Sequence, residues 1–155
     1  MAKAYKGPTH VCHICLAVRD LQAAKRFYEE VIGLKASQER IILEGTPGVV
    51  RQCNFRMGNL TLNIVAPIGP QSVVLNRSLE KHGEGMSHFC LALAPKEMDR
   101  VFAKCKEQGI RLVGPDGELL KPGDRIAYTD PRVTHRTVIE MVDHVLELKG
   151  AGLTE

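Results

Sequence analysis

Two stretches of the chain share one pattern of hydrophobic and polar positions. The first reads HICLAV from His13, and the second reads HFCLAL from His88. Each alternates with the period of two that is typical of a β-strand, and each begins with a histidine. A helical pattern of apolar positions follows each stretch; in the first copy Asp20 is suited to begin the helix and Gly33 to end it. The pattern therefore predicts one strand–helix unit that is used twice.

The first copy opens a β-α-β-β-β series of elements. Its strand, about 11–18, turns His13, Cys15 and Ala17 to one face and the more hydrophobic Cys12, Ile14, Leu16 and Val18 to the other. Because the next helix has apolar residues at helical spacing, we expect it to cover the more hydrophobic face. Three further strands are predicted at about 36–43, 49–57 and 60–65, with Gly58-Asn59 as the turn between the last two.

The second half repeats this series. Its helix is expected to begin near Pro95 and end near Gly109, with Met98, Val101, Phe102 and Cys105 on the buried stripe. Strands are predicted near 111–113, 119, 125–129 and 137–142. The last of them matches 60–65, so Glu140 occupies the place that Asn63 holds in the first half. The segment between the halves, 67–85, is expected to be a connection with one helical turn at 78–82.

The repeat predicts the fold class. We expect an α+β protein in which two β-α-β-β-β modules, about 10–66 and 86–143, form a curved mixed sheet around a cleft. A length of 155 residues suits a single domain, 1–155, in which the two modules share one core.

Composition narrows the classes of function. The net charge is +3 and no block of Lys or Arg is present, which argues against a nucleic-acid partner. No apolar run approaches the roughly 18 residues that a membrane span needs, and residues 1–9 lack the apolar core of a signal peptide, so we expect a cytoplasmic protein. The five cysteines are an odd set, which predicts reduced and mostly buried thiols. Cys15 and Cys90 should lie beneath the two histidines, two residues along the same strand faces.

Four polar residues occupy equivalent positions in the two modules. His13 and Asn63 come from the first module, and His88 and Glu140 come from the second. If the modules curve around one cleft, their imidazoles, carboxylate and amide converge, and such ligands suit divalent Mn, Co, Ni, Zn or Fe. The alternative is two satisfied core histidines and a solvated glutamate. Their matched positions favour a metal, with Asn63 as at most a weak fourth contact because its amide is short and neutral.

On these residues the chain resembles the vicinal oxygen chelate superfamily, which has the glyoxalase and bleomycin-resistance type of fold, over essentially its whole length. The stretches that carry the resemblance are HICLAV, FYEEVIGLK, LTLNIVAP after Gly58-Asn59, KHGEGMSHFCLAL and YTDPRVTHRTVIEMV. Within the superfamily the chain is most similar to methylmalonyl-CoA epimerases. The resemblance implies one divalent metal ion on His13, Asn63, His88 and Glu140, and it implies a homodimer.

The resemblance also implies a reaction. We expect a metal-dependent epimerase or isomerase that moves a proton next to a metal-chelated carbonyl, on a CoA thioester such as methylmalonyl-CoA or on a 2-keto compound. Glu140 is the first candidate for the base, as in glyoxalase I, followed by Glu44 and Glu84. Arg51 stands where the resemblance would place the catalytic glutamate of the epimerases. Its guanidinium could instead bind a substrate carboxylate or phosphate.

Two other functions are compatible with these residues, and a third is not favoured by them. His13, His88 and Glu140 alone form the two-histidine, one-carboxylate set of an Fe(II)-dependent ring-cleaving dioxygenase. A lactoylglutathione lyase-like enzyme uses the same fold. A drug- or metabolite-binding protein of the bleomycin-resistance type would keep the fold and lose the metal ligands, which the ligands present here argue against.

Overall fold

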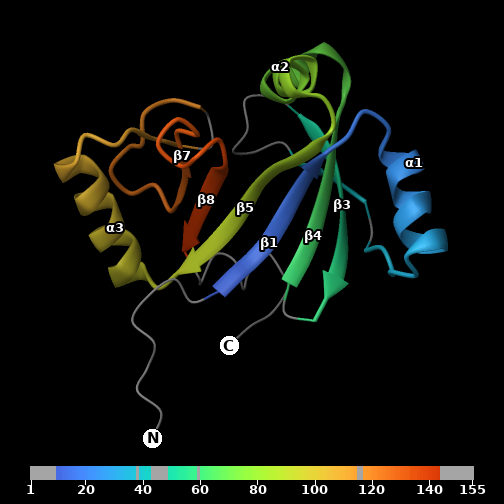
Figure 1. The fold of residues 1–155 in the computed structure, drawn as a ribbon, viewed down its shortest axis with the longest axis horizontal. Coiled ribbons are helices and arrows are strands. Elements are labelled where there is room, and N and C mark those ends of the chain that lie inside the picture. The colour runs from blue at the N-terminus through green and yellow to red at the C-terminus, as the bar shows by residue number, and fades with distance from the viewer. Residues whose placement is uncertain (1–9, 38, 43–48, 59, 115–116, 144–155) are drawn as a thin grey trace, which may run out of the picture.

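The structure, a computed structural model, describes residues 10–37, 39–42, 49–58, 60–114 and 117–143 (Figure 1). These residues form an eight-stranded mixed sheet with strand order β2-β3-β4-β1-β5-β8-β7-β6. The strands are β1 His10–Ala17, β2 Arg40–Ile42, β3 Val50–Met57, β4 Leu60–Pro67, β5 Gly85–Leu93, β6 Leu112–Val113, β7 Ile126–Thr129 and β8 Val138–Asp143. The α-helices are α1 Leu21–Arg26, α2 Val73–His82 and α3 Pro95–Glu107.

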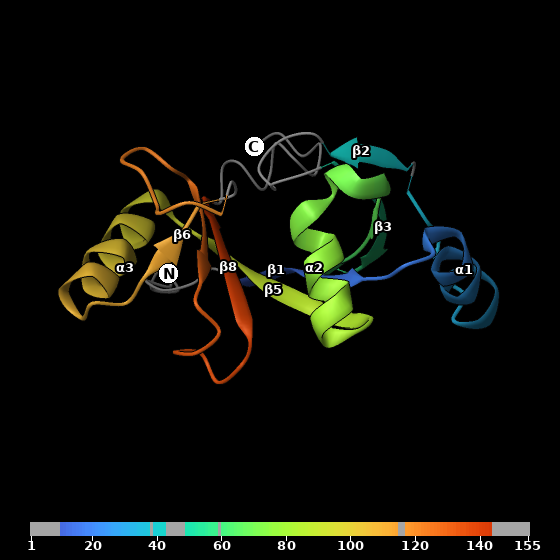
Figure 2. The ribbon, with the colours of Figure 1, turned by 90° about the horizontal axis from the view of Figure 1, so that it is seen from above.

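The strand order has the symmetry that the repeat predicted. β1 and β5 lie at the centre and pair antiparallel, and each pairs in parallel with the last strand of its own module, β4 or β8. Antiparallel strands continue the sheet outward on both sides. Seen from above, the sheet is curved and α1 and α3 lie at its two ends (Figure 2). The predicted α+β class and the two β-α-β-β-β modules are confirmed.

The first helix covers the face of β1 that alternation predicted. Ile14, Leu16 and Val18 pack into a core cluster that contains Leu21 of α1 and Phe55 of β3. The N-cap is also confirmed, because the Ala23 N–H donates to Asp20 Oδ1 at 2.9 Å. Burying these side chains against the helix is what orients the first module's sheet.

The apolar pattern of this helix extends beyond its buried part. A π-helical segment, Phe27–Val31, follows α1, and the Ile32 N–H donates to the Phe27 carbonyl at 3.2 Å. A wider turn rotates the following side chains away from the α-helical stripe. Val31 and Ile32 are accordingly 69% and 53% exposed.

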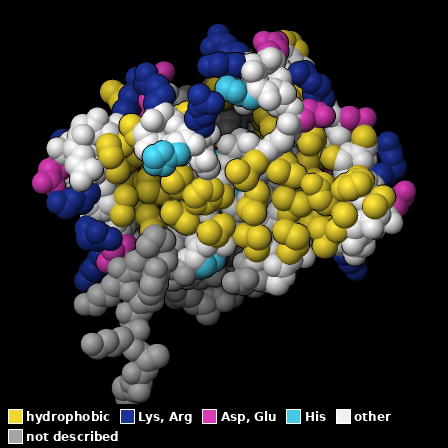
Figure 3. Space-filling model, in the orientation of Figure 1, with side chains coloured by type: hydrophobic (Ala, Val, Ile, Leu, Met, Phe, Trp, Pro, Cys, Tyr) yellow, Lys and Arg dark blue, Asp and Glu magenta, His cyan; other side chains and the backbone are white. Residues whose placement is uncertain are grey.

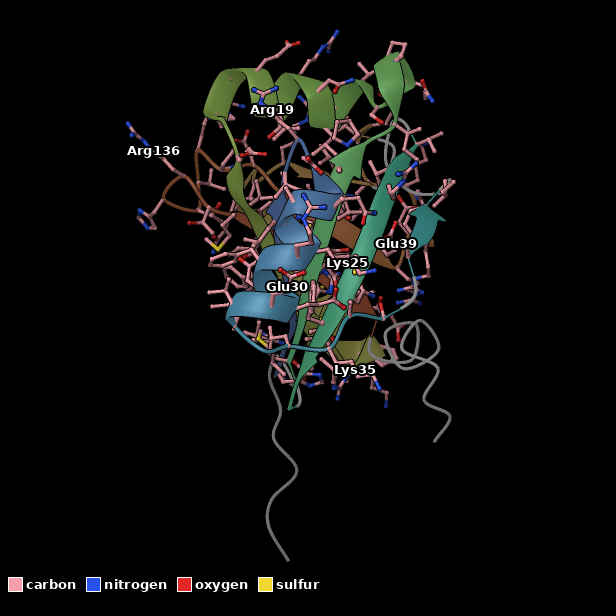
Figure 4. The ribbon with its side chains drawn as sticks, turned by 90° about the vertical axis from the view of Figure 1, so that its right-hand side faces the viewer. Arg19, Lys25, Glu30, Lys35, Glu39 and Arg136 are labelled. Carbon is pink, nitrogen blue, oxygen red and sulfur yellow. The ribbon has the colours of Figure 1, made fainter. Side chains whose placement is uncertain are left out.

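Polar contacts tie α1 to the edge of the sheet. The carboxylate of Glu39, just before β2, accepts hydrogen bonds from Gln22 (2.8 Å) and Lys25 (3.4 Å). Figure 4 shows Lys25 of α1 and Glu39, just before β2, facing each other. β2 is shorter than the predicted strand, since Ala36 forms only an isolated bridge with Phe55. Residues 38, 43 and Asn59 of the predicted strand and turn lie outside the described residues.

The second module has its own core under α3. Pro95 stands in the first turn of the helix, and Met98 is fully buried. Val101, Phe102 and Cys105 pack against the same cluster, as their spacing predicted. The strand predicted near Leu119 is reduced to a single bridge with Val113.

The connection between the modules is more ordered than one helical turn. A 3-10 turn, Gly69–Gln71, leads into α2, which has ten residues. The Ser72 side chain, just before α2, explains where the helix begins. It is fully buried, accepts from the Ile68 N–H at 2.7 Å and donates to the Val49 carbonyl. Leu79 then anchors the helix, with 1% of its surface exposed. In the described parts of the chain, no helix has the length and apolar character to cross a bilayer.

Candidate metal centre

The two histidines meet across the central pair of strands. In the β1–β5 register His13 lies opposite Cys90, and Cys15 lies opposite His88. The histidines are therefore diagonal neighbours on one face of the sheet, within reach of each other's side chains. Their Nε2 atoms are 3.3 Å apart, and their rings meet edge to face with centroids 5.5 Å apart.

Glu140 completes this cluster from the next strand. It lies opposite Cys90 on β8, and its side chain extends over β5 to the histidines. Its Oε2 is 2.8 Å from His13 Nε2 and 2.9 Å from His88 Nε2. Three of the four residues predicted to converge, His13, His88 and Glu140, therefore present one atom each to a common point.

The spacing of these atoms can be compared with that of metal ligands. Adjacent ligands of an octahedral ion with bonds of about 2.1 Å are about 3.0 Å apart, and those of a tetrahedral ion about 3.4 Å apart. Two of the edges here, 2.8 and 2.9 Å, are slightly shorter than the octahedral spacing, and the third, 3.3 Å, lies between the two values. Two imidazole nitrogens and one carboxylate oxygen are a common donor set for borderline divalent metals. The residues therefore fit such an ion.

Burial and charge couple the three groups. Burial alone would raise the pKa of Glu140, which is 7% exposed, but hydrogen bonds from His13 and His88 hold that pKa well below its usual value. For His13, burial lowers the pKa, whereas the contacts with Cys12 and Glu140 raise it to about 10 in the metal-free protein. Without a metal, the cluster is therefore a buried ion pair between an imidazolium and a carboxylate.

Tyr128 is a member of the site that the sequence did not reveal. Its hydroxyl donates to Glu140 Oε1 at 3.0 Å, and its ring meets His88 edge to face, with centroids 5.7 Å apart. Burial and the Glu140 charge raise its pKa well above the usual value, so it stays a neutral donor. It lies directly opposite Glu140 in the β7–β8 hairpin. The register of that hairpin would have identified it, but the long turn at 130–137 left the register open.

Asn63 lies on the same face but outside the triangle. It pairs with Cys15 on β1, and Cys15 pairs with His88 on β5. The strand β1 therefore lies between Asn63 and His88. Glu140 spans the equivalent gap in the other module, but asparagine is shorter by one methylene, about 1.5 Å. When the Asn54 side-chain amide is turned so that its nitrogen faces Asn63, it donates to Asn63 Oδ1 at 3.1 Å. Among the described residues, Asn63 makes no hydrogen bond to the three cluster residues, so its part as a weak fourth ligand stays a prediction.

Cys12 departs from its predicted face. An irregularity in the β1–β5 register between Val11 and His13 interrupts the alternation, and Cys12 packs with Cys90 instead of with the side chains beneath α1. Cys12, His13 and Cys90 form a second group of donors within 4.8 Å of one another. Cys12 and Cys90 are reduced cysteines, and the Cys12 thiol donates to the Cys90 carbonyl at 3.5 Å. Cys15 and Cys90, 4% and 0% exposed, are buried as expected.

The remaining candidates lie elsewhere. The Glu84 carboxylate is exposed and accepts from the backbone N–H of Arg19. Arg51 pairs with Ala66, which belongs to the core beneath α1, so Arg51 faces away from the histidines. Arg51 therefore does not belong to the cluster, and its expected binding of a carboxylate or phosphate stays a prediction. Glu44 lies outside the described residues.

Comparisons with known proteins point to one family. A family model described as Glyoxalase/Bleomycin resistance protein/Dioxygenase superfamily matches residues 12–128. The uncharacterized protein YqjC of Bacillus subtilis is 27% identical over 131 residues, which are 84% of this chain and 89% of that protein. The mitochondrial methylmalonyl-CoA epimerase of Mus musculus is 24% identical over 132 residues, which are 83% of this chain and 70% of the mouse protein.

Solved structures have the same fold. The methylmalonyl-CoA epimerase of Mycobacterium tuberculosis superposes with a TM-score of 0.71 at 22% identity, over 97% of both chains. A variant of the Streptomyces coelicolor epimerase in complex with 2-nitronate-propionyl-CoA gives 0.70 at 26% identity, over 88% of this chain and 98% of that one. A methylmalonyl-CoA epimerase in complex with methylmalonyl-CoA and NH4+ gives 0.70 at 25% identity, over 88% and 95%.

The buried ion pair predicts how stability depends on pH. The pKa of His13 is raised from 6.5 to about 10, so its stabilising effect is complete below pH 6.5 and is lost as the pH rises through 10. After removal of metal with a chelator, the free energy of unfolding should fall by roughly 2–4 kcal/mol over this interval. Urea titrations at several pH values measure it. Glu140→Gln should make the profile shallower but not flat, because the contact of His13 with Cys12 also raises the His13 pKa and remains in the variant. Tyr128→Phe should keep the profile. Equal slopes in wild type and Glu140→Gln would contradict the assignment.

Proposed function

The chain belongs to the Glyoxalase/Bleomycin resistance protein/Dioxygenase superfamily, and from this membership and the geometry of its cluster we propose that it is a divalent-metal-dependent epimerase or isomerase. The observation that carries the proposal is the triangle of His13 Nε2, His88 Nε2 and Glu140 Oε2, with edges of 2.8–3.3 Å. In this proposal the three residues bind one Co, Mn, Ni, Zn or Fe ion. Because His13 comes from one module and the other two from the second, the modules act as one unit.

A bound divalent ion would supply Lewis acidity to substrate oxygens next to the reacting carbon, which makes an α-hydrogen easier to remove. The chain supplies the proton transfer. Glu140 is the candidate base, and its Oε1, the oxygen that the histidines leave free, would hold the proton. Its low pKa keeps it ionised but makes it a weak base, so it needs an acidified substrate. Tyr128 would orient that oxygen through its hydrogen bond.

The similar solved structures support a proposal for the substrate class. Two of the similar solved structures hold methylmalonyl-CoA or 2-nitronate-propionyl-CoA, which are acyl thioesters of CoA. We propose that this chain also acts on a CoA thioester with an acidic α-hydrogen, such as methylmalonyl-CoA. A small 2-keto compound is the alternative within the same chemistry.

One observation favours a second function. The cluster offers two imidazoles and one carboxylate, while Asn63 is turned to Asn54. An octahedral ion on three protein ligands keeps three positions for other groups, the arrangement of Fe(II) dioxygenases. Tightly held iron and oxygen consumption with a catechol would favour the dioxygenase, and α-hydrogen exchange with Co, Mn, Ni or Zn would favour the epimerase.

Metal content tests the ligand set. His13→Ala, His88→Ala and Glu140→Ala should each reduce bound metal to below about 0.1 equivalent after dialysis, because two protein ligands rarely retain an ion. Asn63→Ala should retain most of it, and Asn63→Glu should bind more tightly because it adds a charged and longer side chain. Elemental analysis of the purified proteins gives the result. Equal loss in Asn63→Ala and His88→Ala would make Asn63 a full ligand, and full retention in His88→Ala would remove the centre.

Deuterium exchange tests the reaction. In D2O the metal-loaded protein should exchange the α-hydrogen of methylmalonyl-CoA, as followed by NMR or mass spectrometry. Glu140→Gln, reconstituted with metal at saturating concentration, should exchange the α-hydrogen at a rate at least about 100-fold lower than wild type. Lys104→Ala, at an exposed position of α3, serves as the control and should match wild type. No exchange on any acyl-CoA or 2-keto compound by metal-loaded wild type would rule out the epimerase.

We also propose that two copies of the chain associate through the other face of the central strands. On that face the β1–β5 register aligns Val11 with Leu91, Ile14 with Phe89 and Leu16 with Met86. Val11 and Met86 are 40% and 59% exposed. Hydrophobic side chains form a broad patch between α3 and α1 in the space-filling view (Figure 3). Contiguous apolar patches of this kind are typical of protein interfaces.

A charge in this patch should separate the copies. Val11→Asp should weaken association by about 100-fold or more, since the carboxylate would be buried without a partner. Sedimentation velocity at micromolar concentrations distinguishes dimer from monomer. Ile41→Asp is the matched control, because Ile41 is 58% exposed on the edge strand β2 and should not affect association. A monomeric wild type would refute the dimer.

A further inference from the structure

The residue before each cluster histidine reaches the second ring nitrogen of that histidine. Cys12 Sγ lies 3.8 Å from His13 Nδ1, and Ser87 Oγ lies 3.3 Å from His88 Nδ1. On a regular strand, neighbouring residues point to opposite faces, which prevents such contacts. The β1–β5 register has two irregularities, which leave Cys12 in β1 and Ser87 in β5 without an opposite residue. A β-bulge re-aims the side chain it carries. Both modules thus have the same local device.

These contacts select one form of each neutral imidazole. A neutral histidine carries its proton on one nitrogen only, and the partner of the other nitrogen decides which one. The Cys12 thiol donates to the Cys90 carbonyl at 3.5 Å, so its sulfur is left to accept from His13 Nδ1–H. A serine hydroxyl can accept from His88 Nδ1–H in the same way. A bound metal ion would take the place of the Nε2–H protons that Glu140 accepts, and with the proton held on Nδ1 both Nε2 atoms would present their lone pairs to it.

We infer that Cys12 and Ser87 are positioning residues for the proposed metal centre, each holding the Nδ1–H of the following histidine so that Nε2 is presented as a ligand. The inference rests on the proposed function and adds two residues that do not touch the ion. Hydrogen-bond partners of metal-ligating histidines typically contribute 10–100-fold to metal affinity.

The two modules provide the conservative variants. A thiol contacts His13 and a hydroxyl contacts His88 from equivalent positions in the two modules. Cys12→Ser and Ser87→Cys should therefore keep the contact with Nδ1. Cys12→Ala and Ser87→Ala should remove it. Cys53→Ala is the matched control for loss of a buried thiol. Cys53 is as buried as Cys12, at 0% against 2% exposed, but it packs beneath α1 on the other face of the sheet.

The experiment measures the dissociation constant of Zn2+ for the full chain by competition with a chromophoric chelator. Cys12→Ala and Ser87→Ala should each weaken binding by about 10–100-fold, while Cys12→Ser, Ser87→Cys and Cys53→Ala should stay within about threefold of wild type. Nitrogen-15 NMR of the zinc-loaded protein gives a second readout. The His13 Nδ1–H should exchange slowly with solvent in wild type and Cys12→Ser and faster in Cys12→Ala.

The outcomes separate this inference from the proposed function. Zinc binding by wild type that is unchanged in both alanine variants would overturn the positioning role and leave the metal centre intact. Losses in Cys12→Ala and Cys53→Ala of equal size would assign the effect to packing and would also overturn it. Absence of zinc binding by wild type would overturn both proposals. Weaker zinc binding in Cys12→Ala and Ser87→Ala, together with near-wild-type binding in Cys12→Ser and Ser87→Cys, would support the inference.

Discussion

The antiparallel pairing of β1 with β5 is the constraint on which the rest of the structure depends. It joins the two modules, and its register makes His13 and His88 diagonal neighbours on one face. Side chains alternate along a strand, so a shift of the register by one residue would turn one histidine to the face covered by the helices. The cores under α1 and α3 resist such a shift, because each fixes which face of its own module is buried. Packing on one face of the sheet therefore holds the polar cluster on the other.

The same pairing creates a pseudo-symmetry that the cluster breaks. Asn63 and Glu140 are equivalent: each lies one strand beyond the central pair, opposite Cys15 or Cys90. Only Glu140 crosses to the histidines, because its side chain is longer and its charge is paired there. The Asn63 amide oxygen lies within hydrogen-bonding distance of the Asn54 amide on β3. One substitution between repeats thus converts a symmetric frame into a site with one anionic and one neutral side.

The sequence alone could predict much of this site but not all of it. His13, His88 and Glu140 follow from strand alternation and the repeat, since both reduce to which residues share a face. Cys12 does not, because a bulge breaks the alternation at that residue. Tyr128 depends on the register of a hairpin whose turn is long. The length of α2 was missed because a single buried hydroxyl, Ser72, fixes its start, and a lone serine gives no periodic signal.

The charge of the ligand set bears on the kind of substrate that the proposed centre would favour. Two neutral imidazoles and one carboxylate leave a divalent ion with a net charge of about +1, and the neutral Asn63 does not reduce it further. The cluster is also largely closed to water, with the Glu140 side chain 9% and the His13 side chain 12% exposed. A positive centre in a weakly solvated environment attracts anionic oxygens more strongly than neutral ones. Such a centre favours substrates that develop negative charge on chelating oxygens as a neighbouring proton leaves. Were Asn63 a glutamate, the added charge would bind the proposed ion more tightly and at the same time weaken this preference, so in the proposed centre an asparagine would give lower metal affinity and a more electrophilic ion.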